Sequence, residues 1–400
     1  MIYVNRLFYF SLLLFSFLFV YFHGGKIPYM LFYTILLIPA ISLIHVLVVN
    51  YFLKYKKEFN MLTAIKGNTI YFKSRFINKS LIFFPYLKIL FIGMNPVCPE
   101  YSLSQDIYLV PFSQKTFKFK FDCKYRGIYK MGIKTLEIRD FFGMFKLTRK
   151  VEDMTDIIVF PKIIHLDKFH VISNYNTESN ISKKNIFEDM STVSNVREYR
   201  MGDSLKKIHW KLTSKMQDFM IKDYNNTSDI NCVLLMDAEA MPYTHKDSVV
   251  IEDKVIECAV SVIHYFLSKW IKVKLLYCSD KINELEMDSP AEFKQVYSLL
   301  AGLNFSGKTG IDKMVELYSV MNITQTSIIV LTSNISYDLY DVVYKTKKNG
   351  QDISIIYVSP ENLIGTKNID VENIMSSLSS IGISVFTIDI NDNIKPVLEK

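Results

Sequence analysis

The chain lacks the cysteine spacings that would indicate a disulfide framework or a zinc site. Its five cysteines are odd in number and form no C-x-x-C pair. Four of them lie within apolar stretches, which predicts buried free thiols in a reducing compartment. These four are Cys123, Cys232, Cys258 and Cys278.

Two further absences bear on function. No G-x-S-x-G elbow occurs, and the seven histidines lie near no suitable serine or cysteine, which argues against nucleophilic catalysis. The formal net charge is +7, yet lysine and arginine are dispersed, whereas a nucleic-acid-binding surface gathers them on one face. We therefore expect neither an enzyme with an activated nucleophile nor a nucleic-acid-binding protein.

Long hydrophobic runs are present near the N-terminus. Residues 7–22 carry no charge and are almost wholly apolar, and a link at residues 23–26 leads to a second charge-free run, residues 27–53. Insertion of the first run is favourable by roughly 5 kcal/mol, and the second is long enough to cross a bilayer with tilt. No A-x-A-like cleavage site follows the first run, which disfavours a signal peptide. We predict a transmembrane hairpin over residues 1–57.

The basic residues beside these runs predict an orientation. Arg6 precedes the first run, and Lys54, Lys56 and Lys57 follow the second, whereas the link carries only Lys26. The positive-inside rule then places both termini in the cytoplasm. We expect a multi-pass protein of the cell membrane with two helices and a cytoplasmic body.

Residues 58–162 have the pattern of a β-rich domain. Phe117, Phe119 and Phe121 alternate with Lys118 and Lys120, and a period of two is typical of a half-buried strand. Short strands at this spacing predict a small β-sandwich or barrel. Further strands are expected at residues 69–77, 107–112, 133–139 and 157–160.

A polar connector is expected next, over residues 163–195, because serine, asparagine, threonine and lysine dominate there. From residue 229 to residue 400, apolar strands alternate with amphipathic helices, which predicts a doubly wound α/β domain. The expected strands are residues 230–236, 273–277, 327–331, 353–358 and 384–388. The expected helices are residues 252–270, 290–302, 310–322, 337–349 and 370–381.

Residues 196–228 hold an unusually dense mixture of charges and large apolar side chains. The sequence contains R-E-Y-R-x-G-D, then I-H-W-K, then K-D-Y, and we expect a helix over residues 204–215. Charges so interleaved must be paired. The segment is therefore either a clamp between subdomains or a docking or ligand site that uses His209 and Glu198. Its candidate residues are Arg197, Glu198, Tyr199, Arg200, Gly202, Asp203, His209, Trp210 and Lys211.

This signature resembles the hallmark of the domain of unknown function 58 family, whose members carry R-E-Y-x-x-G-D followed by I-H-W-K or I-D-W-K. Two other fragments fit the same family in the same order. Residues 126–129, R-G-I-Y, resemble its R-G-x-Y, and residues 140–145, D-F-F-G-M-F, resemble its D-P-F-G-L-F with Phe141 in place of proline. The resemblance implies two transmembrane helices followed at the end by a von Willebrand A-like region.

A von Willebrand A-like region implies a magnesium site, and polar residues do follow two of the expected strands. Asp237 and Thr309 match the first and fourth metal ligands of such a site, and Glu239 and Met241 replace its two serines. Asn334 stands where the last aspartate would be. Because a thioether is a poor Mg²⁺ ligand, we expect a degenerate site and no bound cofactor.

Residues 302–309 match G-x-x-x-x-G-K-T, the pattern of a phosphate-binding loop. A phosphate loop directly follows a strand, whereas residues 293–300 have a helical pattern. A nucleotide hydrolase that uses Lys308 and Thr309 is therefore kept only as an alternative.

These observations favour a non-enzymatic, membrane-anchored scaffold that binds protein partners. The family resemblance implies a MoxR-type AAA+ ATPase as the usual partner. A Mg²⁺-dependent ligand-binding module at Asp237 is the other alternative.

Overall fold

The structure is a computed structural model that describes residues 2–97, 101–169, 188–198, 208–216, 218–226, 232–279, 281–321, 326–365 and 369–400. The chain divides into two compact units, and each is described by itself. The first unit comprises Met1–Ile163, Met241–Glu257 and Gln295–Asn304. The second unit comprises Ile164–Ala240, Cys258–Lys294 and Phe305–Lys400.

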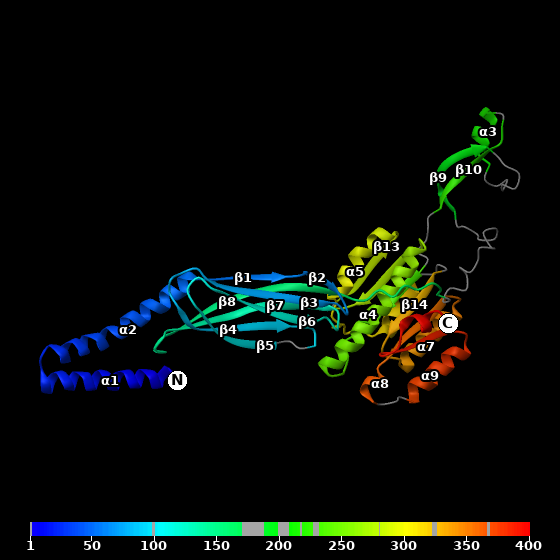
Figure 1. Cartoon of the computed structure of the whole chain (residues 1–400). Coiled ribbons are helices and arrows are strands. Elements are labelled where there is room, and N and C mark those ends of the chain that lie inside the picture. The colour runs from blue at the N-terminus through cyan, green and yellow to red at the C-terminus, as the bar shows by residue number, and fades with distance from the viewer. Residues whose placement is uncertain are drawn as a thin grey trace. The chain divides into compact units, whose positions relative to one another are not determined.

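The first unit begins with the two expected apolar helices. Helix α1 spans Ile2–His23 and helix α2 spans Lys26–Phe52, and both are long and apolar enough to cross a membrane (Figure 1). Gly24 and Gly25 join them with φ values of 56° and 86°, a left-handed conformation that glycine adopts without a Cβ penalty. The tight link follows from this conformation.

The last turns of α2 belong to the core of the first unit. Val46 and Val49 are buried among strand residues, together with Leu53, the first residue of strand β1. The first part of α2 is mostly exposed instead. One continuous apolar run therefore forms a single helix whose first part is exposed and whose last turns are buried. Hydropathy alone does not distinguish the two parts.

Two sheets of the first unit pack face to face. A three-stranded sheet has the order β1-β3-β6, and a five-stranded sheet has the order β2-β8-β7-β4-β5. Phe72 and Phe76 of the first sheet pack with Phe91 of the second in one aromatic core, as expected for a small β-sandwich. The strands are β1 (Leu53–Phe59), β2 (Thr63–Ile65), β3 (Thr69–Asn78), β4 (Phe84–Met94), β5 (Tyr101–Leu109), β6 (Gln114–Asp122), β7 (Gly127–Arg139) and β8 (Lys146–Phe160).

The sequence placed several of these strands correctly but misjudged their ends. The alternation along β6 is confirmed, with half-buried phenylalanines and exposed lysines. The strand expected at residues 107–112 ends at Leu109, because Phe112 turns with φ 56°. Strands β1, β2 and β4 were not predicted, since β1 continues directly from a helix, β2 has only three residues and β4 carries no clean alternation.

The expected connector is in part a strand. Strand β9 (Glu188–Glu198) pairs antiparallel with β10 (Met220–Asn226), so the prediction of a loop up to residue 195 is wrong from residue 188 onward. The pairing of β9 depends on a partner more than 20 residues away, which local polar composition does not reveal. Residues 170–187 of the expected connector lie outside the described residues.

The second unit contains a six-stranded sheet with the order β13-β12-β11-β14-β15-β16. All neighbours are parallel except the β12–β13 pair, so the edge strand β13 runs antiparallel. Strand β13 was not predicted, and as an edge strand it carries two exposed or half-exposed glutamates. The strands are β11 (Cys232–Met236), β12 (Val273–Cys278), β13 (Ile282–Met287), β14 (Ser327–Thr332), β15 (Asp352–Ser359) and β16 (Ser384–Asp389).

Helices connect the parallel strands as a doubly wound sheet requires. One buried cluster joins the sheet to α6, α7 and α9, through residues such as Val315, Val343 and Leu378. All the expected helices of this region are present. They are α4 (His245–Ser268), the 3₁₀ turn η2 (Pro290–Glu292) with α5 (Phe293–Gly302), α6 (Ile311–Met321), α7 (Tyr337–Lys348) and α9 (Ile369–Ser380), with the short α8 (Glu361–Ile364) and α10 (Ile394–Leu398) in addition.

Candidate functional site

The signature segment forms a β-hairpin that carries a short helix. Strand β9 ends with Arg197 and Glu198, which pair with Ile221 and Met220 of β10. The K-D-Y part begins one residue later on β10, where Lys222 pairs with Val196, so the two parts of the signature lie on neighbouring strands (Figure 1). Tyr199, Arg200, Gly202 and Asp203 lie outside the described residues, as does the side chain of Arg197.

The I-H-W-K part folds back onto β10 and caps the short helix. Ile208 forms an isolated antiparallel bridge with Ile221, and both side chains are buried. The main-chain N–H of His209 donates to the Met220 carbonyl at 2.8 Å. The Nδ1 atom of His209 accepts from the Leu212 N–H at 3.3 Å, so His209 caps helix α3 (Trp210–Met216).

This geometry corrects the helix predicted over residues 204–215. Ile208 and His209 are not helical, and α3 begins at Trp210. The physical reason is that Ile208 pairs with a strand, which fixes an extended backbone just before the helix. His209 serves as a capping residue, a role that its neighbourhood of charges did not suggest.

The hairpin leaves large apolar side chains exposed. Trp210 is 67% exposed, and Met216 and Phe219 are 61% and 56% exposed. Lys211 and Lys215 beside them are exposed as well. Within the described residues of the hairpin, the buried apolar side chains are those of Ile208 and Ile221, and Trp210 is not among them.

The R-G-I-Y fragment has a structural role within the first unit. Arg126 is 5% exposed, and its guanidinium Nη1 donates to the carbonyls of Leu303 at 2.7 Å and Ala301 at 3.3 Å, at the end of α5. Its main-chain N–H donates to Asp253 at 2.8 Å. A cation at a helix C-terminus is stabilising, because it satisfies unpaired carbonyls and complements the helix dipole.

The rest of the fragment fixes the turn that presents Arg126. Gly127 has φ 126°, and a Cβ on it would lie 2.7 Å from Pro96. The hydroxyl of Tyr129 donates to the Tyr125 carbonyl at 2.9 Å, and burial raises the pKa of Tyr129. Asp253 also pairs with Lys66, which in turn pairs with Glu257 at 2.9 Å. The buried charges here are thus compensated by one another.

The D-F-F-G fragment is held by a buried carboxylate. Asp140 is 3% exposed and accepts hydrogen bonds from the N–H groups of Phe142 and Phe145, at 3.0 and 2.7 Å. It also accepts from the hydroxyl of Ser42 on helix α2. The fragment is therefore a loop between β7 and β8 that is attached to α2.

Two of the candidate metal residues, Asp237 and Glu239, follow the carboxyl end of β11, as expected. Both oxygens of Asp237 accept hydrogen bonds, from the Thr332 hydroxyl at 2.6 Å and from the Glu239 N–H at 3.1 Å. Burial raises the pKa of Asp237, and the charge of Asp312 adds to the rise. Burial, Asp237 and Asp312 likewise raise the pKa of Glu239.

The loop that carries Thr309 comes close to this carboxylate pair. A Cβ on Gly310 would lie 3.7 Å from the Glu239 carboxylate. The main chains of Gly307 and Glu239 form an isolated parallel β-bridge. Asp312 was not singled out from the sequence, although this residue lies at the start of the helix predicted over residues 310–322, in the first turn of α6. Within the described ranges, no group of three or more His, Cys, Asp or Glu side chains is arranged to hold a metal ion. The degenerate magnesium site stays a prediction.

The G-x-x-x-x-G-K-T segment follows helix α5, as its pattern indicated. The N–H of Gly307 donates to the Ala238 carbonyl at 2.9 Å, and its carbonyl accepts from the Ala240 N–H at 3.0 Å. A phosphate loop needs such main-chain N–H groups free to face the phosphates. The context differs from that of a phosphate loop, and nucleotide hydrolysis stays an untested alternative.

Three solved structures each resemble about a quarter of this chain, with low TM-scores. The CARDB domain of the PF1109 protein from Pyrococcus furiosus is 14% identical and covers 27% of this chain and 89% of its own length, with a TM-score of 0.20. A β-glucosidase from Listeria innocua is 9% identical with a TM-score of 0.19, and the match covers 27% of this chain and 16% of the enzyme. The C-terminal domain of wzt is 12% identical with a TM-score of 0.22, over 28% of this chain and 75% of that domain. No curated protein matches the chain.

A family comparison gives a match over a defined region. Residues 195–358 match the family described as protein of unknown function DUF58. The matched region begins inside β9 and contains the end of that strand with α3 and β10, whereas the R-G-I-Y and D-F-F-G fragments precede it. The chain is therefore similar to the DUF58 family over residues 195–358.

Proposed function

We propose that this protein is a membrane-anchored scaffold whose signature hairpin, β9, β10 and α3, docks a protein partner. The observation that carries this proposal is the exposure of Trp210, Met216 and Phe219 on an element whose backbone is fixed by buried Ile208 and Ile221. Exposed aromatic residues on a rigid element are typical of binding hot spots. The catalytic alternatives have no comparable support.

The anchor is the helical hairpin α1–α2. Its two helices are long and apolar enough to cross a bilayer, and most of their large apolar side chains are exposed. An exposed apolar surface of this size is unfavourable in water, so we propose that lipid surrounds the two helices. We propose that both termini lie in the cytoplasm, because basic residues flank the outer ends of the hairpin.

We propose that residues 229–400 form a von Willebrand A-like domain. The strand order β13-β12-β11-β14-β15-β16, with one antiparallel edge strand, is compatible with that fold. The family resemblance implies a MoxR-type AAA+ ATPase as the partner. The exposed lysines next to Trp210 would favour an acidic face on that partner.

The test is Trp210→Ala in the full chain, with Trp270→Ala as its matched control, since Trp270 is an equally exposed tryptophan in the same unit. Because Trp210 is exposed, we expect the free energy of unfolding to change by less than about 0.5 kcal/mol. We expect affinity for the co-expressed ATPase to fall roughly 30-fold, the effect of a typical hot spot.

Two results would count against docking. If Trp210→Ala unfolds the protein, the hairpin acts as a clamp between parts of the chain. If both variants bind the ATPase as tightly as the parent does, the hairpin is not the docking surface. Binding would be measured on the purified, detergent-solubilised proteins.

A further inference from the structure

Three loops gather at one end of the β-sandwich in the first unit. They are residues 79–83, 110–113 and 140–145. Asn78 joins the first two, since its Nδ2 donates to the carbonyls of Ile82 at 2.8 Å and Val110 at 3.1 Å. The ring of Phe83 lies 6.5 Å from that of Phe141, which brings in the third loop.

Each of these loops carries an exposed apolar side chain at its tip. Leu81 is 80% exposed, Phe112 is 68% exposed and Phe141 is 71% exposed. Phe112 also has φ 56°, a left-handed conformation that costs a bulky residue free energy. Backbone conformations with such a cost cluster at functional sites, so the exposed Phe112 is a candidate for a functional role. Three neighbouring apolar tips form a larger patch than scattered surface residues do.

The same end of the sandwich lies beside the start of the apolar span of α1. The Asn5 side chain donates to the Phe142 carbonyl at 2.9 Å, and the Arg6 Nε donates to the Met144 carbonyl at 2.9 Å. The first residue of the apolar run in α1 is Leu7, immediately after Arg6. Figure 1 shows the end of the β7–β8 hairpin next to the start of α1. The loops thus lie at the level where the hairpin enters the bilayer.

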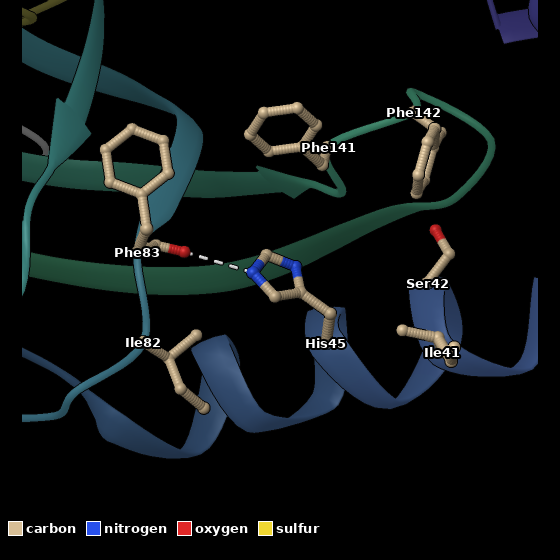
Figure 2. A pocket seen from close by; sticks show the side chains of 7 residues that line it. All are labelled: Ile41, Ser42, His45, Ile82, Phe83, Phe141 and Phe142. Atoms are coloured by element: carbon tan, nitrogen blue, oxygen red, sulfur yellow. Dashed lines mark hydrogen bonds between the residues drawn. The ribbon is translucent and has the colours of Figure 1, made fainter. Parts of the chain in front are cut away.

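A cavity of about 290 Å³ opens between these loops and helix α2. Figure 2 shows Phe141 and Phe142 on one side and α2 on the other, with the His45 Nε2 hydrogen-bonded to the Phe83 carbonyl at 3.0 Å. Apart from Ser42 and His45, its lining is wholly apolar. The lining residues are Ile41, Ser42, His45, Ile82, Phe83, Phe141 and Phe142.

The charge around the loops is positive. Lys79, Lys115 and Lys146 are exposed at their edges, and Lys146 pairs with Glu137 at 2.6 Å, a carboxylate that also pairs with Arg139. The loops themselves contain one acidic residue, Asp140, which is buried and hydrogen-bonded. Lysines near a bilayer surface are attracted to anionic headgroups. Apolar tips ringed by lysine match the layered chemistry of a bilayer interface.

From this geometry we infer a phospholipid-binding surface, in which the three loop tips enter the headgroup region and the cavity holds part of an acyl chain. The inference rests on the proposed anchoring of α1 and α2. Lipid is the occupant that the position favours, because the cavity floor is α2, the helix whose exposed first part is proposed to lie in the bilayer. The β-sandwich is thereby held against the leaflet rather than free on a tether.

The test uses tryptophan as a probe of lipid contact in the full chain. Phe112→Trp reports on a loop tip, and Phe142→Trp reports on the cavity. Tyr71→Trp is the matched control, because Tyr71 is 52% exposed on β3, about 23 Å along the strand from Asn78. Each variant is reconstituted into vesicles whose phospholipid acyl chains carry bromine, a fluorescence quencher, and the parent emission is subtracted.

We expect the added emission of Phe112→Trp and Phe142→Trp to be quenched by brominated lipid, and that of Tyr71→Trp to be unaffected. Flotation of the vesicles is measured first. If the protein floats but the two probes remain unquenched, the lipid surface is wrong while the anchor stands, and the patch would instead suit a membrane-embedded protein. If the protein does not float, the anchoring proposal fails and this inference fails with it.

Discussion

Arg126 shows how a single buried charge can be stabilising. Its guanidinium is out of water, yet it donates to two carbonyls at the end of α5 and lies 3.8 Å from Glu252. Burial lowers the pKa of Arg126, and the charges of Asp253 and Glu252 oppose that effect. The two carbonyls and the two carboxylates favour the charged form of Arg126 and offset the cost of burying it.

Removing this side chain deprives the Ala301 and Leu303 carbonyls of the hydrogen bonds that Arg126 donates. We expect Arg126→Met to lower the free energy of unfolding by about 3 kcal/mol, at the low end for a broken buried pair, because Lys66 still pairs with Asp253. The control is Arg149→Met, at an exposed arginine in β8, with an expected change below about 0.5 kcal/mol. Denaturant unfolding of the detergent-solubilised chain measures both. Equal stability of the two variants would contradict a structural role for the R-G-I-Y arginine.

Among the elements, the G-x-x-x-x-G-K-T segment shows most clearly that a sequence can match a motif whose structural context is absent. Its two glycines have different surroundings. A Cβ on Gly307 would lie 2.4 Å from the Cys278 carbonyl and 2.9 Å from the Ala238 carbonyl, whereas a Cβ on Gly302 would meet no atom within 4 Å. Gly307 is thus required by the close approach of two main-chain segments at strand ends.

This difference predicts opposite effects of the same substitution. Gly307→Ala should lower the free energy of unfolding by about 2 kcal/mol, because main-chain atoms must move to admit the methyl group. Gly302→Ala, in the last turn of α5, should leave stability unchanged or raise it by about 0.5 kcal/mol. Thermal unfolding of each variant provides the comparison. A larger loss for Gly302→Ala than for Gly307→Ala would refute this account of the segment.

For the whole molecule, the orientation of the α1–α2 hairpin decides which compartment the two units occupy. The proposed orientation exposes the link between the helices on the outside and the signature hairpin on the inside. His23 ends α1 beside the link, and Ser214 lies on α3, and both side chains are exposed. The four described cysteines are buried, so they should label slowly.

Labelling with a membrane-impermeant maleimide tests that orientation. In intact cells, His23→Cys should react, and Ser214→Cys should react only after the membrane is permeabilised. The parent chain serves as the background for both. If Ser214→Cys reacts in intact cells, the signature hairpin lies outside the cell. The proposed topology is then inverted, and a cytoplasmic partner is ruled out.

The amino-acid sequence by itself determined the features that depend on local pattern. The apolar helices α1 and α2, the alternating strand β6 and the strand–helix alternation after residue 229 follow from hydrophobic periodicity, which is local along the chain. The R-E-Y-x-x-G-D and I-H-W-K signature likewise indicated the family before any fold was known. These features need no knowledge of distant contacts.

Only the tertiary structure decided what the singled-out residues contact. That His209 caps a helix, that Trp210 is exposed and that β9 is a strand all depend on pairing with β10, which local sequence does not encode. Likewise, Arg126 reaches α5 across more than 170 positions, and the last turns of α2 enter the sandwich core. Such contacts are set by packing between distant segments, and that packing gives each residue its role.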